Sequence, residues 1–280
     1  MQASRKQMKQ TPGGDEESQF GELKSLNGSD DGIRWYPTRR NYSWRELIAD
    51  RIVLIFGAVL SWPAAYLLIA RTLNLGGAER LRLAGICIYC FGMIAMLNVS
   101  MLYHLNASSE RLAPWLLFLD KISISFMIAG TYTLVCVFAH CYGLLFLEWG
   151  LVIFGLAWEI YLFNTTVAWK TSVDIGRFIL AGWACLLFIP WLIPYFRCWV
   201  AWCLLVQGIL YTVGTVFLQS TWLEFHYCAW HVCVLVAASV FYAVAYSVLS
   251  VGPPFGQALG QTVDDWELAR RSMSDHLGMF

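Results

Sequence analysis

Histidine and acidic side chains stand at the ends of several apolar segments of the chain. His104 ends one such segment, Asp120 opens the next, and His226 and His231 open the last. Three neutral imidazoles around one open coordination position make up a catalytic zinc site. Ser100 lies four residues before His104 and would share a helix face with it. These residues predict a zinc ion held by His104, His226 and His231, with Asp120 and Ser100 beside it as catalytic residues.

The chemistry expected of such a site is hydrolysis. Zinc lowers the pKa of a bound water to about 7 and polarises a carbonyl group. Asp120 would act as a general base or orient a ligand, and the Ser100 hydroxyl would hydrogen-bond the water or the substrate carbonyl. The alternative is that each histidine lies at a membrane interface and hydrogen-bonds backbone groups or water.

The composition shows which kind of scaffold must position these residues. Hydrophobic residues make up 58% of the 280 residues and charged residues only 14%, whereas a soluble domain has about 25% charged residues. This excludes a soluble globular protein, a disordered chain and a coiled coil. The formal net charge is zero, so the chain lacks the basic field of a nucleic-acid-binding protein.

Several segments are long and apolar enough to cross a membrane, because a spanning helix needs about 20 apolar residues. They lack the period-2 alternation of a lipid-facing β-barrel. We therefore predict an all-α membrane protein, a seven-transmembrane helix bundle. The predicted spans are residues 52–70, 82–104, 115–138, 143–163, 175–196, 199–219 and 227–250.

Counting the spans predicts that the candidate site residues converge. The second span ends on the N-terminal side of the membrane, and the third and seventh spans begin on that side. His104, Asp120, His226 and His231 should therefore lie at one depth in the membrane. Reversing the whole topology would move this group to the other face without dispersing it.

The bundle is expected to occupy residues 43–251, between two polar tails. Residues 1–42 are polar and Gly-rich, which predicts a disordered tail, and residues 252–280 form a short C-terminal tail. Most Lys and Arg residues lie on the N-terminal tail and beside loops of the same side, which predicts a cytoplasmic N-terminus and an extracytoplasmic C-terminus. The N-terminal tail is then a candidate site for a cytoplasmic partner.

Other polar residues within the spans have simpler interpretations. Glu148 and Glu159 share one face of the fourth span. They either line a polar cavity or lie near the two membrane boundaries, and we favour the boundaries. Cys87 and Cys90 form a C-x-x-C without a second pair, so a zinc ribbon is not favoured.

The motifs that carry these residues resemble a known family. Residues 99–104 (VSMLYH) look like its S-x-x-x-H at the end of the second span, and residues 119–120 with 128–133 are similar to its third-span signature. Residues 208–214 and 229–236 resemble its sixth and seventh spans, and Glu46 matches a position before the first span. The chain thus resembles, over residues 42–250, the haemolysin III / progestin and adipoQ receptor family, within the wider group that includes alkaline ceramidases.

The resemblance implies a seven-helix membrane protein with one zinc ion held by three histidines. His104 and His231 would be ligands, and Asp120 and Ser100 would lie beside the metal water. Relatives are receptors for adiponectin or steroids, or hydrolases of lipid amides such as ceramide. The substrate or ligand is therefore expected to be a membrane lipid or a sphingolipid-like molecule.

The seventh span departs from the family pattern H-x-x-x-H. The residue four before His231 is Tyr227, and the other histidine is His226. Five residues of a regular helix turn the chain by about 500°, so the two rings would diverge. Either His226 precedes the first helical turn, or a π-bulge realigns the rings. Otherwise Tyr227 takes the ligand position and zinc binding is weakened. A family histidine of the first span is also missing near Leu54.

Two functions follow from this reading. The first is a zinc-dependent intramembrane hydrolase of a ceramide-like lipid amide. The alternative is a membrane receptor or lipid sensor with a structural or degenerate zinc site. A channel or transporter has little support, because the sequence contains neither an inverted repeat nor a stripe of charged residues along several spans.

Overall fold

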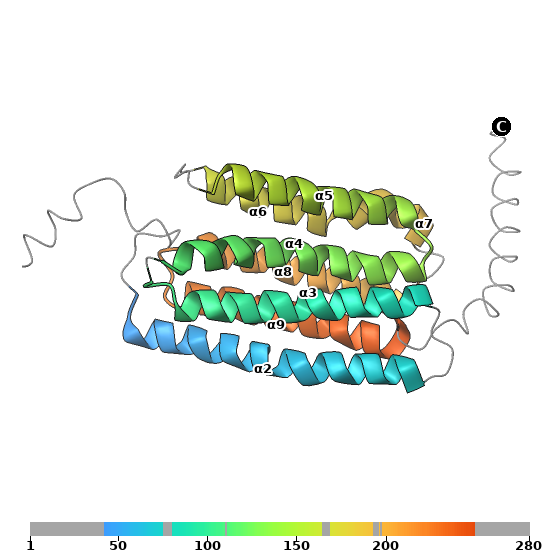
Figure 1. Ribbon diagram of the computed structural model, residues 1–280, viewed down its shortest axis with the longest axis horizontal. Helices are drawn as coiled ribbons and strands as arrows, with labels where there is room; N and C mark the ends of the chain where they lie inside the picture. Colours follow the sequence, from blue (N-terminus) through green and yellow to red (C-terminus); the bar gives the residue numbers. More distant parts are fainter. Residues whose placement is uncertain are drawn as a thin grey trace, which may run out of the picture. The chain divides into compact units, whose positions relative to one another are not determined.

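The computed structural model describes residues 42–74, 80–109, 111–163, 169–192, 196 and 198–249. In these ranges seven helices are long and apolar enough to cross a membrane, and no strand occurs (Figure 1). The predicted all-α architecture with seven spans is therefore confirmed. The predicted tails, residues 1–42 and 252–280, lie outside the described residues apart from Tyr42.

The observed spans agree with the predicted ones except at their ends. The first span begins at Trp44, not at residue 52, and so contains Asp50. The fifth span is a helix that continues as a 3₁₀ turn, and a short helix α7 (Ile189–Leu192) follows it. The other elements are α2 (Trp44–Asn74), α3 (Arg80–Leu105), α4 (Ala113–Phe138), α5 (Tyr142–Tyr161), α6 (Lys170–Gly182), η1 (Ala184–Phe188), α8 (Cys198–Gln219), α9 (His226–Val244) and the π-helical η3 (Ala245–Leu249).

The helices form a ring in which each spanning helix packs against at least two others. Chain neighbours pack on each other from α2 to α6, α8 packs on α6 and α9, and α9 returns to contact α2. In Figure 1, α2, α3, α4 and α5 lie side by side, with α9, α8 and α6 behind them. The starts of α2, α4 and α9 and the end of α3 thus lie at one end of the bundle, which we call the site end.

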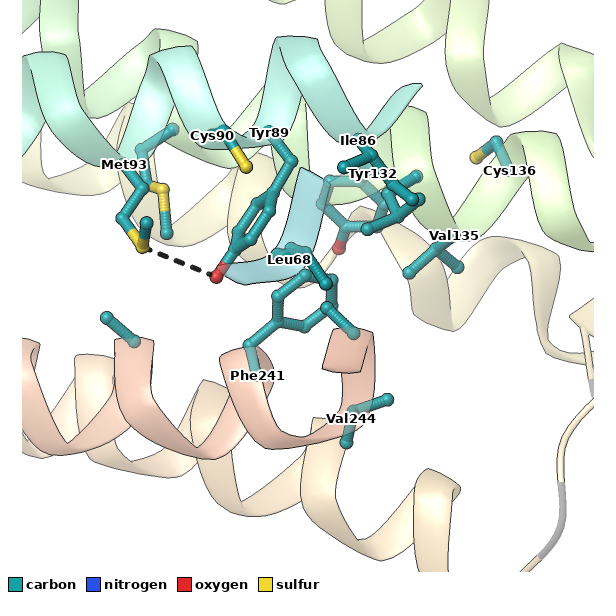
Figure 2. Close-up of a cluster of buried hydrophobic side chains, with 14 of the residues drawn as sticks. Leu68, Ile86, Tyr89, Cys90, Met93, Tyr132, Val135, Cys136, Phe241 and Val244 are labelled. Atoms are coloured by element: carbon teal, nitrogen blue, oxygen red, sulfur yellow. Dashed lines mark hydrogen bonds between the residues drawn. The ribbon is translucent and has the colours of Figure 1, made fainter. Parts of the chain in front are cut away.

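An apolar core between α2, α3, α4 and α9 holds the helices in register. Leu68, Ile86, Tyr89 and Phe241 are fully buried, and the rings of Tyr89 and Phe241 have centroids 5.0 Å apart (Figure 2). The Tyr89 hydroxyl donates to the sulfur of Met93 at 3.8 Å. This packing fixes the relative heights of helices that carry polar residues at the site end.

Two glycines bring α3 and α4 into close contact. A Cβ on Gly92 would lie 2.9 Å from the Phe126 carbonyl oxygen, and a Cβ on Gly130 would lie 3.2 Å from the Ile88 carbonyl oxygen. Small residues at such crossings let the backbones of membrane helices approach closely. The crossing determines how the end of α3 faces the start of α4.

Candidate metal centre

Two histidines and one aspartate meet inside the site end of the bundle. Asp50 of α2, His104 of α3 and His231 of α9 are all buried, and each offers one ligand atom within 4.8 Å of the other two. Asp50 Oδ1 lies 2.6 Å from His231 Nδ1, and Asp50 Oδ2 lies 3.0 Å from His104 Nδ1. Because a carboxylate only accepts, the imidazole N–H groups donate in these contacts.

The start of α2 is held by a capping box, a reciprocal pair of hydrogen bonds at a helix N-terminus. The Ser43 amide donates to Glu46 Oε2 at 2.9 Å, and the Glu46 amide donates to Ser43 Oγ at 3.3 Å. Glu46 Oε1 also accepts from the amide of Phe225 at 3.1 Å. Phe225 has a left-handed backbone (φ 58°) and precedes α9. Glu46 therefore fixes the start of α9 against α2, and with it the positions of Asp50 and His231.

The unusual histidine spacing involves two residues at the start of α9, His226 and Tyr227. His226 is the first residue of α9, and the helix is regular from there to His231, so the π-bulge is not seen. The His226 ring is fully buried, and its Nε2 lies 3.0 Å from the Tyr42 hydroxyl. Tyr227 instead contacts both other histidines, with ring centroids 5.6 Å from His104 and 6.4 Å from His231. The compact group of donors thus contains His104 and His231 but not His226, whose role as a ligand remains a prediction.

Asp120 and Ser100 lie beside this group. The Asp120 carboxyl interacts with the Ser100 side chain and, electrostatically, with His104. Asp120 Oδ1 is buried and has no hydrogen-bond partner among the described residues. The predicted neighbourhood of Ser100, His104 and Asp120 is therefore present, with one acceptor left for a further polar group.

Sequence reasoning missed Asp50. The predicted first span began at residue 52, which left Asp50 in the polar stretch just before the span, where an acidic residue needs no explanation. Counting the spans could have pointed to Asp50, because the first span starts on the same side of the membrane as His104 and His231. An acidic residue two positions before an apolar run on that side was a candidate for the same group.

Comparison with known proteins shows the family of this chain. A sequence model of the haemolysin-III-related family matches residues 52–242. The chain belongs to the haemolysin III family. It is 30% identical to Hemolysin-3 of Bacillus cereus over 225 residues, covering 76% of this chain and 96% of that protein. It is 28% identical to a Hemolysin-3 homolog of Bacillus subtilis (strain 168) over 215 residues, covering 75% and 98%. Within this haemolysin III protein, the matched region contains both histidines of the group, while Asp50 lies just before it.

The donor set fits a metal ion. Two imidazoles and one carboxylate are the protein ligands of several catalytic zinc sites, in which the fourth position is open. The same three donors also hold iron(II) in another enzyme class. The buried Asp120 Oδ1 without a partner is the second sign, because such an atom is costly unless water or an ion satisfies it.

Proposed function

We propose that this haemolysin III protein is a zinc-dependent intramembrane hydrolase of lipid amides. The observation that carries the proposal is the buried group of Asp50, His104 and His231, joined at one end of a membrane bundle from three separate helices. Ionisable residues inside membrane helices are costly and are therefore functional candidates. The neighbouring Asp120 and Ser100 add an acid–base group and a hydroxyl.

Each residue has a defined part in this proposal. Asp50, His104 and His231 hold the zinc ion, which when bound lowers the pKa of water and polarises a carbonyl. Asp120 takes the proton of the attacking water and later delivers it to the amine nitrogen that leaves. Hydrolysis forms one C–O bond and breaks the C–N bond, giving a carboxylic acid and an amine. The Ser100 hydroxyl donates to the Asp120 carboxylate and so holds this base in position.

The substrate class follows from the surroundings of the site. The helices that carry the site expose large apolar side chains along their outer faces, as lipid-facing helices do. A substrate with hydrocarbon tails reaches such a site from the bilayer, while its amide lies near the polar headgroups. A ceramide-like lipid amide has this shape, and we propose it as the substrate.

Metal analysis together with lipid turnover tests the proposal. Purified full-length protein should contain close to one zinc per chain and should hydrolyse ceramide in mixed micelles. Changing His231→Ala and Asp120→Asn together should abolish turnover. Glu148→Gln, which alters a buried carboxyl on α5 away from this group, is the matched control. Wild type without stoichiometric metal, or turnover unaffected by the double change, would overturn the proposal.

A receptor or lipid sensor is the second candidate, and one observation favours it. The Asp50 carboxylate already accepts from both imidazoles, and Tyr227 packs against them, so the group is internally satisfied without an ion. The Asp120→Asn variant separates the two candidates. If the protein is a receptor, the variant should bind a lipid ligand as tightly as wild type does, and neither protein should release an amine. If the protein is a hydrolase, wild type should release the amine, whereas the variant should bind the substrate without releasing it.

We also propose that the site end faces the cytoplasm. Lys121, Lys170 and Arg177 lie at this end of the bundle, and cytoplasmic ends of membrane helices carry excess Lys and Arg. A protease-accessible tag on the N-terminus should be cleaved only after cells are permeabilised. Cleavage in intact cells would reverse the orientation.

A further inference from the structure

A second polar cluster lies at the site end, on the opposite flank of α4 from the metal centre. It joins Lys121 of α4, Glu159 of α5, and Lys170, Asp174 and Arg177 of α6. Lys121 Nζ lies 2.5 Å from Asp174 Oδ2 and 3.8 Å from Glu159 Oε2. Glu159 also meets Lys170 at 3.4 Å and Arg177 at 3.3 Å. We call these five residues the α4–α6 ion cluster.

In the α4–α6 ion cluster the acidic side chains are more deeply buried than the two lysine side chains. The side chains of Glu159 and Asp174 are only 2% and 3% exposed, whereas those of Lys121 and Lys170 are 17% and 16% exposed. The carboxylates therefore lie inside and the ammonium groups form the outer edge. The cluster contains three cations for two carboxylates, and both carboxylates are already shared between cations.

Arg177 lies in a space made for it. A Cβ on Gly155 would overlap the guanidinium group, so only glycine leaves room for it there. Its NH1 donates to Ser125 Oγ and its NH2 to Glu159 Oε1, both at 3.3 Å. Its Nε is buried and has no hydrogen-bond partner among the described residues. The cluster thus holds at least one unused donor and lacks an acceptor for it.

Aromatic side chains lie near the cluster, at the end of α5 and the start of α6. Trp169 directly precedes Lys170, and its side chain is 50% exposed. Tyr161 is the last residue of α5, two residues after Glu159, and its side chain is 80% exposed. The indole of Trp158 donates to Asp174 Oδ1 at 3.1 Å. Exposed Trp and Tyr at helix ends mark the boundary between hydrocarbon and headgroups.

Asp120 directly precedes Lys121 in the chain, but its carboxyl group lies on the flank of α4 that faces the candidate metal centre. It feels the charge of Lys121, but its side-chain contact is with Ser100 on α3. Neighbouring residues of a helix point about 100° apart, which separates the two sites. Asp120 therefore interacts with Lys121 only electrostatically, while its side-chain hydrogen bond is with Ser100 on the other flank of α4.

We propose that the α4–α6 ion cluster binds the phosphate group of an anionic membrane lipid through Lys121 and Lys170. Basic pockets between membrane helices recognise anionic headgroups, and each Lys or Arg near the surface strengthens this attraction by about fivefold in affinity. The aromatic surroundings favour a lipid over free phosphate. This inference does not depend on the metal centre or on hydrolysis.

Lipid counting by native mass spectrometry tests the site on the full-length protein. Phosphatidylglycerol and phosphatidylcholine are added in equal amounts, and the ratio bound to the protein is measured. Wild type should prefer phosphatidylglycerol. Lys170→Gln should weaken that preference by about fivefold, and Lys170→Arg should retain it. Arg80→Gln, the same charge change on the exposed opposite end of α3, should have no effect.

An opposite charge change separates lipid binding from a purely structural role. Asp174→Asn keeps the shape and makes the cluster more positive, so phosphatidylglycerol should bind more tightly even if the melting temperature falls. A structural ion network predicts loss of stability and no gain in binding. No preference in wild type, or equal effects of Lys170→Gln and Arg80→Gln, would overturn the proposal. Displacement of the lipid by millimolar inorganic phosphate would assign the site to free phosphate instead.

Discussion

Asp50 Oδ1 and His231 Nδ1 lie 2.6 Å apart, although 181 residues separate them in the chain. The contact joins the first and last spans of the bundle and closes the ring of helices. His104 lies beside this contact, so the three side chains form a group that could hold a metal ion. The same hydrogen bonds fix the orientation of both imidazoles, which is the part that carboxylates play in many metal sites.

Removing the carboxylate of Asp50 should reduce metal binding. Asp50→Asn keeps the size of the side chain but removes its negative charge, and a carboxylate that only orients histidines contributes about 10–100-fold to metal affinity. A direct ligand should contribute more. Competition with a fluorescent zinc chelator measures the change. Glu148→Gln serves as the matched control, and unchanged affinity in Asp50→Asn would exclude Asp50 from the site.

The two histidines of α9 should differ in their effects on the metal. His231→Ala should remove zinc, because His231 belongs to the compact group. His226→Ala should leave zinc bound, because the His226 ring contacts Tyr42 instead. Elemental analysis of purified protein gives the ratio of zinc to chain. Zinc loss in both variants would instead support the three-histidine set predicted from the sequence.

Tyr227 occupies the position from which the family pattern supplies a histidine. Its ring already contacts His104 and His231, so Tyr227→His should place a third imidazole beside them. The variant should bind zinc more tightly than wild type, because a third imidazole completes the three-histidine set of a catalytic zinc site. Tyr227→Phe removes only the hydroxyl and should leave zinc affinity unchanged. An equal affinity in Tyr227→His would show that this position does not reach the ion.

Glu46 should contribute to stability because its carboxylate accepts hydrogen bonds at the N-termini of both α2 and α9. Glu46→Ala removes the capping box of α2 and leaves the Phe225 amide without its acceptor. The cost should be about 1–3 kcal/mol, the range for a lost cap or an unsatisfied buried amide. Thermal unfolding in detergent measures it. Arg45→Ala, at the exposed neighbouring position, should change the melting temperature little.

The close contact of α3 and α4 should tolerate no added methyl group at Gly92. A Cβ there would lie 2.9 Å from a backbone carbonyl oxygen that cannot move freely. Gly92→Ala should destabilise the protein by about 1–3 kcal/mol, as overpacking does. Gly150→Ala is the matched control, because nothing lies within 4 Å of its added Cβ. Equal melting temperatures of the two variants would contradict the tight crossing.

The apolar segments were enough to predict the fold, since the lengths of such segments decide which ones cross a membrane. Counting the spans also placed His104, Asp120 and His231 at one end of the bundle, because alternate spans run in opposite directions. Their types and the S-x-x-x-H spacing made a metal centre a reasonable hypothesis. The start of the first helix was wrong because polar residues begin it, and the capping box that defines this start extends it before the apolar run.

Sequence by itself determined the membrane class, the seven spans and the depth at which the candidate residues gather. Only the tertiary structure decided which side chains meet there. Depth is a property of each helix alone, whereas contact depends on how α2 and α9 are rotated and packed against α3. That packing brings Asp50 to both histidines and directs His226 toward Tyr42. It also separates the metal centre from the α4–α6 ion cluster, although Asp120 and Lys121 are adjacent in the chain.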